Sequence, residues 1–309
     1  MSKFQELPGL VLRGMAMGAA DVIPGVSGGT IAFITGIYDR LLEALRSATP
    51  ATLKVLKEQG LAACWKKIDG TFLLCVFGGV LISVMTLAHL IGYLLAEYPE
   101  LIWSFFFGLI LVSGSHMLRQ VENWSVGSLV LFVTGIAVAW LIGGLTPASL
   151  TPTPVMLFFA GSIAICAMIL PGISGSFILL LMGLYASVLE AVRSLDILTL
   201  AIFGSGCVLG LLTFSHALSW LLRRHRDLAL SLLTGLMIGA LGTIWPWKQT
   251  LETRVNSSGE QVPFLQENVS PFVYESLTGH PAYFLPAIAL MLSAIILFLV
   301  IEWIGRDKT

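Results

Sequence analysis

Charge is what this 309-residue chain has least of: Asp, Glu, Lys and Arg make up 11% of it, against roughly 25% in an average soluble domain. Hydrophobic residues make up 56%. Such a composition excludes a soluble globular protein and indicates an integral membrane protein. The net charge of −1 lacks the basic excess that binding to a phosphate backbone requires, which argues against nucleic acid as a partner.

The sequence also lacks the spacings of disulfide frameworks and metal sites. Its four cysteines, Cys64, Cys75, Cys166 and Cys207, stand far apart, and three of them fall inside apolar runs, which predicts small packing residues. No metal-ligand cluster, nucleotide loop or arrangement of His, Arg, Lys and Asp suited to a lipid phosphatase is present. We therefore expect no cofactor and no metal, and a transporter rather than an enzyme.

Long apolar runs, in contrast, are abundant. A crossing helix needs about 20 residues, and four shorter apolar pieces form two pairs, each joined by Pro-Gly-x-Ser-Gly. Short segments interrupted by Gly and Pro at matching positions of two halves indicate a transporter site. We predict that each pair is a re-entrant hairpin. The long runs are 72–95, 101–118, 127–145, 197–222, 228–247 and 282–304, and the pairs are 8–23 with 27–38 and 154–170 with 176–189.

An internal repeat relates the two hairpins. Residues 20–47 and 167–194 align with thirteen identities in twenty-eight pairs, where ordinary composition gives about two. Matches continue further on, for example His89 with His216. The sequence therefore predicts an all-α polytopic membrane protein of two inverted-topology repeats, 1–147 and 148–309. Each repeat is a re-entrant helical hairpin plus three transmembrane helices.

The basic residues predict the orientation of these repeats. The positive-inside rule places the basic stretch 39–70 and both termini in the cytoplasm, with Arg193, Lys248 and Arg254 as exceptions. Hairpin 8–46 then opens to the cytoplasm and hairpin 154–193 to the outside. Two insertions lie outside the symmetric core: a cytoplasmic amphipathic stretch, 47–70, and a polar extracytoplasmic loop, 248–281.

The repeated motif predicts an anion site. Proline lacks an N–H and glycine turns sharply, so Pro24-Gly25 and Pro171-Gly172 are predicted helix breaks. Each new helix presents unpaired amides at its first turn, a ready site for phosphate. The alternative is that these small residues only allow close packing of helices. The predicted phosphate ligands are Arg13, Ser27, Gly28, Gly29, Thr30, Ser174, Gly175 and Ser176.

Other polar residues are candidates for coupling or gating, each with a structural alternative. Asp21 would take up a coupling H⁺ or Na⁺, or cap the broken helix. Arg13 would pair with a phosphate, or extend to the cytoplasmic interface. The remaining candidates are Glu43 with Arg46 and Glu190 with Arg193, as i,i+3 ion pairs or headgroup gates, and His89 and His216, as structural residues or proton-linked switches.

The stretch from Arg13 to Thr30, RGMAMGAADVIPGVSGGT, and the stretch from Pro171 to Ser176, PGISGS, resemble the hallmark motifs of a bacterial membrane family. This family was long described only as a domain of unknown function and is associated with undecaprenyl-phosphate (polyprenyl-phosphate) translocation. The resemblance implies a plasma-membrane flippase that returns undecaprenyl phosphate from the outer to the inner leaflet for envelope synthesis. Its partners would be that lipid and the surrounding membrane lipids.

The residues themselves leave other functions open. The same half-helix site would suit a transporter or channel for a small inorganic anion, and a lipid-phosphate enzyme is a second alternative. The oligomeric state, a homodimer included, is also left open.

Overall fold

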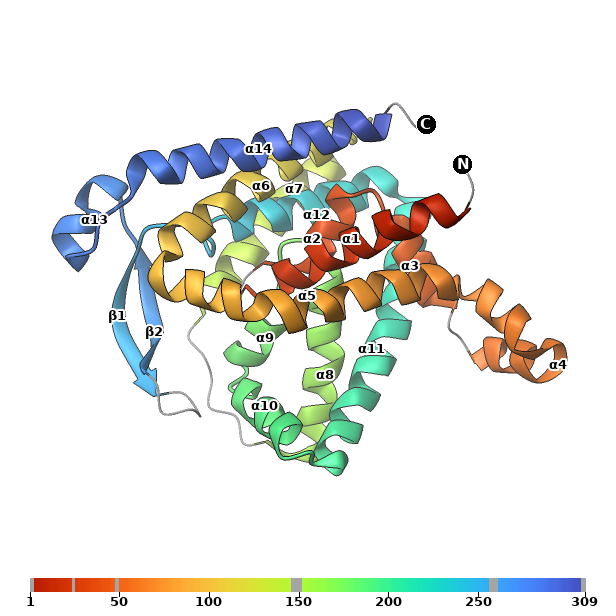
Figure 1. The fold of residues 1–309 in the computed structure, drawn as a ribbon. Helices are drawn as coiled ribbons and strands as arrows, with labels where there is room; N and C mark the ends of the chain where they lie inside the picture. The colour runs from red at the N-terminus through yellow and green to blue at the C-terminus, as the bar shows by residue number, and fades with distance from the viewer. Residues whose placement is uncertain (1–2, 24–25, 48–49, 146–151, 256–260, 307–309) are drawn as a thin grey trace.

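The computed structural model describes residues 3–23, 26–47, 50–145, 152–255 and 261–306, and 79% of these residues are helical (Figure 1). The helices are α1 Lys3–Asp21, α2 Gly28–Ile34, α3 Tyr38–Ser47, α4 Pro50–Lys67, α5 Gly70–Glu97, α6 Pro99–Arg119, α7 Val126–Gly143, α8 Pro154–Ile169, α9 Gly175–Leu181, α10 Tyr185–Arg193, α11 Ile197–Arg224, α12 Arg226–Ala240, α13 Pro271–Thr278 and α14 Phe284–Arg306; the strands are β1 Lys248–Val255 and β2 Gln261–Asn268.

Among the described residues, four helices, α5, α6, α7 and α11, are long and apolar enough to cross a membrane, and α8 and the described part of α14 are shorter apolar helices. Because α5 and α11 have 28 residues each, they are about 42 Å long at 1.5 Å per residue. That exceeds the roughly 30 Å of hydrocarbon in a bilayer, so both would cross with a strong tilt. The predicted span 228–247 is shorter than expected, since α12 ends at Ala240 and a turn follows.

Eight of the helices pack as four pairs, two within a repeat and two between the repeats. α1 lies along α5 and α8 along α11, whereas α6 packs with α14 and α12 with α7. Glycines make the first two contacts close, because a Cβ on Gly14 would overlap the carbonyl of Val76, and one on Gly161 would overlap that of Phe203. Small residues allow this backbone approach in membrane proteins, where lipid supplies no hydrophobic drive for association.

Each predicted outgoing arm of a hairpin contains a second break. The arm 27–38 was expected to be continuous, but α2 ends at Ile34 and α3 begins at Tyr38, with Gly36 at φ 69° between them. In the other arm α9 and α10 are bent by 113°, with Gly183 at φ 72°. Glycine adopts this left-handed conformation without steric cost, which explains why the chain turns at these two residues.

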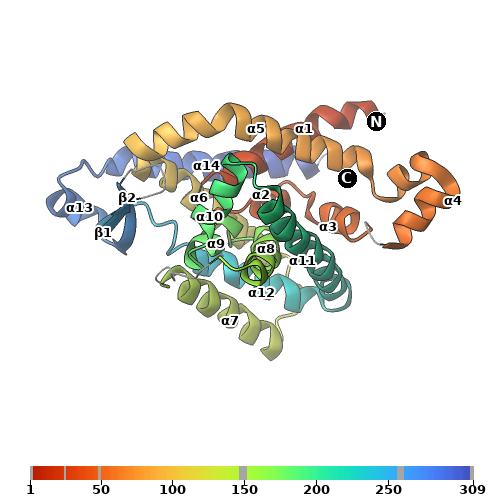
Figure 2. The same ribbon diagram turned by 90° about the horizontal axis from the view of Figure 1, so that it is seen from below.

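The segment 248–281 is more structured than the predicted polar loop. β1 and β2 form an antiparallel hairpin and α13 follows, at the opposite end of the molecule from α4 (Figures 1 and 2). The hydroxyl of Tyr274 donates a hydrogen bond to the buried carboxylate of Glu100 on α6. The indole of Trp247 donates to the carbonyl of Ala282 (2.7 Å). These bonds anchor the insertion on the helical core.

Candidate functional site

The two break motifs, far apart in sequence, meet in the structure. α2 contacts the end of α8, and five of the six residues that join the two motifs are buried; the sixth, Met168, takes part through its backbone carbonyl and has an exposed side chain. Polar bonds in such a place are strong, because no water competes for them. Three hydrogen bonds make this junction: Ser27 Oγ donates to the carbonyl of Met168 (2.9 Å), the amide of Gly172 donates to Thr30 Oγ1 (3.0 Å), and the hydroxyl of Tyr38 donates to the carbonyl of Ile169 (3.0 Å).

At the first motif, the amides at the start of α2 are already bonded to the protein. Asp21 Oδ1 accepts from the amide of Gly28 (2.7 Å), and Ser27 Oγ accepts from that of Gly29 (3.1 Å). The amide of Thr30 donates to the carbonyl of Ser27 (2.9 Å). In this structure Asp21 therefore caps α2, as one of its two predicted roles requires. A phosphate that binds these amides would have to displace the carboxylate. Pro24 and Gly25 lie outside the described residues.

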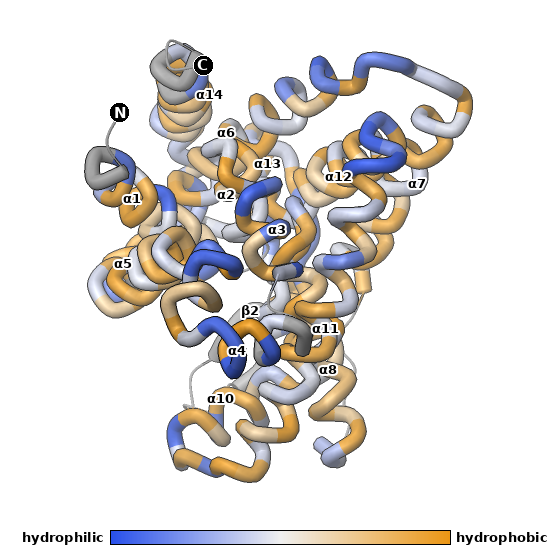
Figure 3. Tube along the Cα trace, turned by 90° about the vertical axis from the view of Figure 1, so that its right-hand side faces the viewer, coloured by the Kyte–Doolittle hydropathy of each residue, from blue (hydrophilic) through white to orange (hydrophobic). Residues whose placement is uncertain are grey.

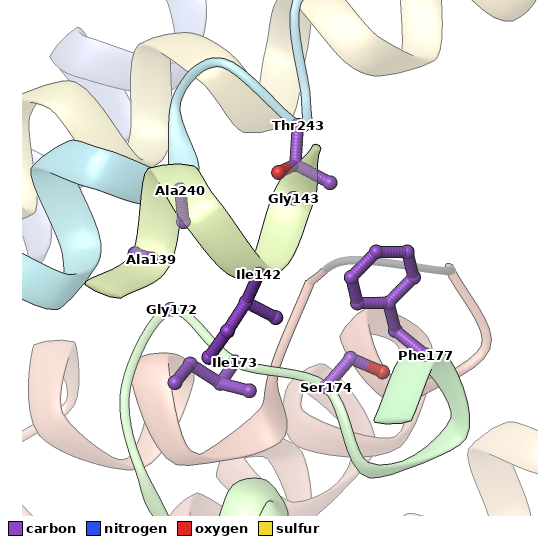
Figure 4. Close-up of a pocket in the computed structure, with 9 residues that line it drawn as sticks. All are labelled: Ala139, Ile142, Gly143, Gly172, Ile173, Ser174, Phe177, Ala240 and Thr243. Carbon is purple, nitrogen blue, oxygen red and sulfur yellow. The ribbon is translucent and has the colours of Figure 1, made fainter. Parts of the chain in front are cut away.

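The second motif differs, because none of the described side chains caps α9. Ser174 occupies the N-cap position without a capping bond, and its hydroxyl lies 2.8 Å from that of Ser176. A small cavity of about 10 Å³, room for about one water molecule, adjoins this helix end. In Figure 4, Phe177 and Thr243 border the space next to Ser174, with the C-terminal ends of α7 and α12 on the opposite side. Here the uncapped N-terminus of α9 faces this small cavity.

A second, larger cavity, of about 100 Å³, lies at the other end of α12. Its walls include Tyr38, Asp39, Gln120 and Arg226. The first cavity reaches Ala240 at the C-terminus of α12, so the two cavities flank the molecule from opposite ends of this helix. Because Tyr38 both lines the second cavity and hydrogen-bonds to the second motif, the junction separates the two spaces.

Charged residues tie α3 to the corner between α11 and α12. Glu43 pairs with Arg46 (2.6 Å), the i,i+3 partner on its own helix, and with Arg223 at 3.4 Å. Asp39 lies 4.0 Å from Arg226. All these side chains are at least partly exposed, so each pair is worth at most about 1 kcal/mol. These ion pairs lie beside the second cavity and are weak enough to break readily, and we call them the latch.

The other predicted site residues do not converge on the junction. Arg13 is exposed on α1, and within the described ranges it forms no ion pair. His89 is exposed on α5, and His216 is exposed on α11, with Nδ1 2.7 Å from the carbonyl oxygen of Leu212. Two more, Glu190 and Arg193, are exposed near the end of α10.

Lys248 was not predicted as a site residue. Its ammonium donates to the carbonyl of Thr243, whose residue lines the first cavity, and lies 5.1 Å from the ring centre of Trp103. Among the described side chains, no carboxylate lies within ion-pair distance of it, and burial lowers the pKa of this lysine to about 8. The sequence signal was its status as an exception to the positive-inside rule.

These features define a polytopic helical membrane protein whose two broken helices meet between two cavities. In the part of the chain that the structure describes, no group of three His, Cys, Asp or Glu side chains could hold a metal. The chain belongs to the undecaprenyl phosphate translocase-like family, whose model matches residues 17–262.

Two similar proteins are both named polyprenyl-phosphate transporter. The chain is 60% identical over 291 residues to a polyprenyl-phosphate transporter of Vibrio cholerae, covering 94% of both proteins. It is 29% identical over 266 residues to a polyprenyl-phosphate transporter of Staphylococcus aureus, covering 76% of this chain and 85% of that one. No solved structure matches the chain.

Proposed function

We propose that the protein is a flippase that returns undecaprenyl phosphate from the outer to the inner leaflet of the bacterial plasma membrane, by alternating access. The lipid class comes from the family and from the names of the two relatives. The observation that carries the mechanism is the hydrogen-bonded junction of the two break motifs between two cavities. The helix N-termini there would replace water around the phosphate while the prenyl chain stays in lipid.

An inverted repeat of re-entrant hairpins is part of this proposal. The helix bounds support it: α2 and α9 have seven residues each, and α5 and α11 have 28 each. The glycine contacts support it too, since Gly14 and Gly161 hold equivalent positions and touch equivalent residues. With the positive-inside rule, the latch on α3 lies on the cytoplasmic side, together with both termini.

Matched residues of the two repeats are unequally buried, which supports a gate at each face. Tyr38 on α3 is 3% exposed, whereas its counterpart Tyr185 on α10 is 41% exposed; Leu45 is 8% exposed, and its counterpart Val192 is 52% exposed. α3 packs against α11 of the other repeat, while α10 packs on α9 and α11 of its own and lies apart from α5 (Figure 1). We infer an outward-facing state with the cytoplasmic gate closed.

Asp21 would couple proton uptake to phosphate binding. Its carboxylate occupies the Gly28 amide, so protonation would weaken that bond and free the amide for phosphate. We expect an imposed pH gradient to change the transport rate of the wild type several-fold and that of Asp21→Asn not at all, measured in proteoliposomes. Asp21→Ala also removes the cap and should cost about 1 kcal/mol of stability. An equal response of wild type and Asp21→Asn would exclude this role.

Lys248, whose ammonium bonds to the carbonyl of Thr243, would recognise the phosphate at the first cavity. We expect Lys248→Met to raise the KM for the lipid phosphate about tenfold, the effect of losing a hydrogen bond to a charged group. Lys248→Arg should retain affinity. Because the pKa of Lys248 is about 8, wild-type affinity should fall between pH 7 and pH 9 as the ammonium deprotonates, and that fall should vanish in Lys248→Met. Arg119→Met, at an exposed arginine at the end of α6, is the control, and an equal effect there would refute the assignment.

The proposed function is tested by the lipid that the protein carries. Mass spectrometry of the purified protein should find polyprenyl phosphate, and proteoliposomes should move it between leaflets. Saturable chloride or sulfate flux, without any bound polyprenyl phosphate, would instead support a transporter of small inorganic anions.

A further inference from the structure

Helix α4 has no role in the transport mechanism proposed above. It projects from the bundle beside α3 in both views (Figures 1 and 2), and it bends at Gly60, where φ is 81°. It also has no counterpart in the second repeat, where residues 194–196 alone join α10 to α11. The surface of α4 therefore belongs to the first repeat alone.

The end of α4 lies where a membrane span begins. The indole Nε1 of Trp65 donates to Thr71 Oγ1 at 3.0 Å, and its ring lies so close to Gly70 that a Cβ there would overlap it. Gly70 is the first residue of the apolar span Gly70–Leu87. Trp65 is thus held at the level where the chain enters the bilayer, the depth at which tryptophan is enriched in membrane proteins.

The exposed surface of α4 combines basic and apolar side chains. Leu61 is 72% exposed and Trp65 is 41% exposed. Figure 3 shows hydrophilic and hydrophobic residues interspersed on α4, whereas α5 is mostly hydrophobic. Segments at a lipid interface combine the two, with apolar groups in the acyl boundary and basic groups among headgroups. On α4 as a whole the two kinds of side chain do not segregate to opposite faces, so the predicted amphipathic pattern is not seen across the kink at Gly60. The exposed charged residues are Lys54, Lys57, Glu58, Lys66 and Lys67, with a net charge of 4 − 1 = +3, and no ion pair of theirs is found within the described part of the chain.

We propose that α4 lies on the membrane surface and binds the headgroups of anionic phospholipids in the leaflet from which α5 enters. The positive charge complements anionic headgroups, and Trp65 fixes the helix at their depth. A soluble partner protein would not need the apolar residues at this depth. Under the proposed topology this leaflet is the cytoplasmic one, but binding at the surface does not depend on transport.

The test uses the full chain with its four native cysteines replaced by serine and a single Leu61→Cys labelled with an environment-sensitive fluorophore. In vesicles containing phosphatidylglycerol we expect a blue-shifted emission that brominated acyl chains quench. Neutral phosphatidylcholine vesicles, or high salt, should remove most of that quenching, because the attraction between charges is screened.

Two variants sharpen the result. Replacing Lys54, Lys57, Lys66 and Lys67 together with glutamine should abolish the quenching in anionic vesicles. A label at Leu251→Cys on β1, which is also exposed, should report water in every vesicle and serves as the matched control. A label at position 61 that stays in water in phosphatidylglycerol vesicles, or that the glutamine variant leaves unchanged, would overturn the proposal. Neither readout requires lipid transport, so it is separate from any failure of the proposed function.

Discussion

Gly29→Ala is expected to abolish transport and to destabilise the protein. A Cβ at this position would lie 2.6 Å from the carbonyl oxygen of Ile169 and 2.8 Å from that of Met168. Both are backbone atoms at the end of α8, which cannot rotate away as a side chain would, so α2 must move. Overpacking of this kind costs about 1–3 kcal/mol. The same movement would break the two bonds that join the motifs, the one that Ser27 donates to Met168 and the one that Thr30 accepts from Gly172. Thermal unfolding in detergent and leaflet exchange in proteoliposomes measure the two effects.

Gly204→Ala is the matched control. Gly204 lies within α11, and an added Cβ would meet no atom within 4 Å. The substitution should leave transport unchanged and stabilise the helix by up to about 1 kcal/mol, since alanine is the better helix former. Transport by Gly29→Ala at the wild-type rate would show that close contact between the motifs is not needed.

Crosslinking either proposed gate is expected to stop transport completely. Glu43 and Arg223 lie together on the closed side in this structure, and the repeat relates them to Glu190 on α10 and Ala96 on α5. In a cysteine-free background, Glu43→Cys with Arg223→Cys should react with a short bifunctional maleimide in the resting protein. Glu190→Cys with Ala96→Cys should react only when α10 has moved onto α5, and therefore faster while substrate lipid is present.

Each crosslink should reduce leaflet exchange to background, because alternating access requires both gates to open in turn. The single-cysteine variants treated with the same reagent are the controls. Failure of the Glu190→Cys and Ala96→Cys pair to react during transport, or undiminished exchange after either crosslink, would contradict the gating mechanism.

The repeat made the helix breaks predictable from the sequence. Thirteen identities at one offset located both Pro-Gly motifs and the helices that begin after them, and the structure starts α2 and α9 at the matched residues Gly28 and Gly175. The second breaks, at Gly36 and Gly183, carried the same signal, a repeated glycine two residues before tyrosine. They were missed because a short apolar run reads equally well as one helix or two.

What fills the amides of each motif could not be predicted. Asp21 has no counterpart in the second repeat, where Met168 takes its place, and its spacing from Pro24 fitted both coupling and capping. Only the fold brings it to Gly28. The unequal burial of Tyr38 and Tyr185 was also hidden from the sequence, because the repeat gives both tyrosines similar surroundings. Two conformations of one protein have the same sequence and differ little in free energy, so the sequence does not tell which of the two tyrosines is buried. The β-hairpin depended on strand register, which polar residues exposed on both faces specify weakly.

The packing of helices from one half against helices of the other half has a consequence for the origin and assembly of the chain. Since α6 packs with α14 and α12 with α7, each half completes the other's core, as in a domain-swapped dimer. A separately expressed half would leave its second span without a neighbour and would be degraded or would pair with a copy of itself. Under the proposed inverted topology, a single-repeat ancestor would have worked as two subunits inserted in opposite directions, and joining them into one gene would have fixed one copy in each orientation.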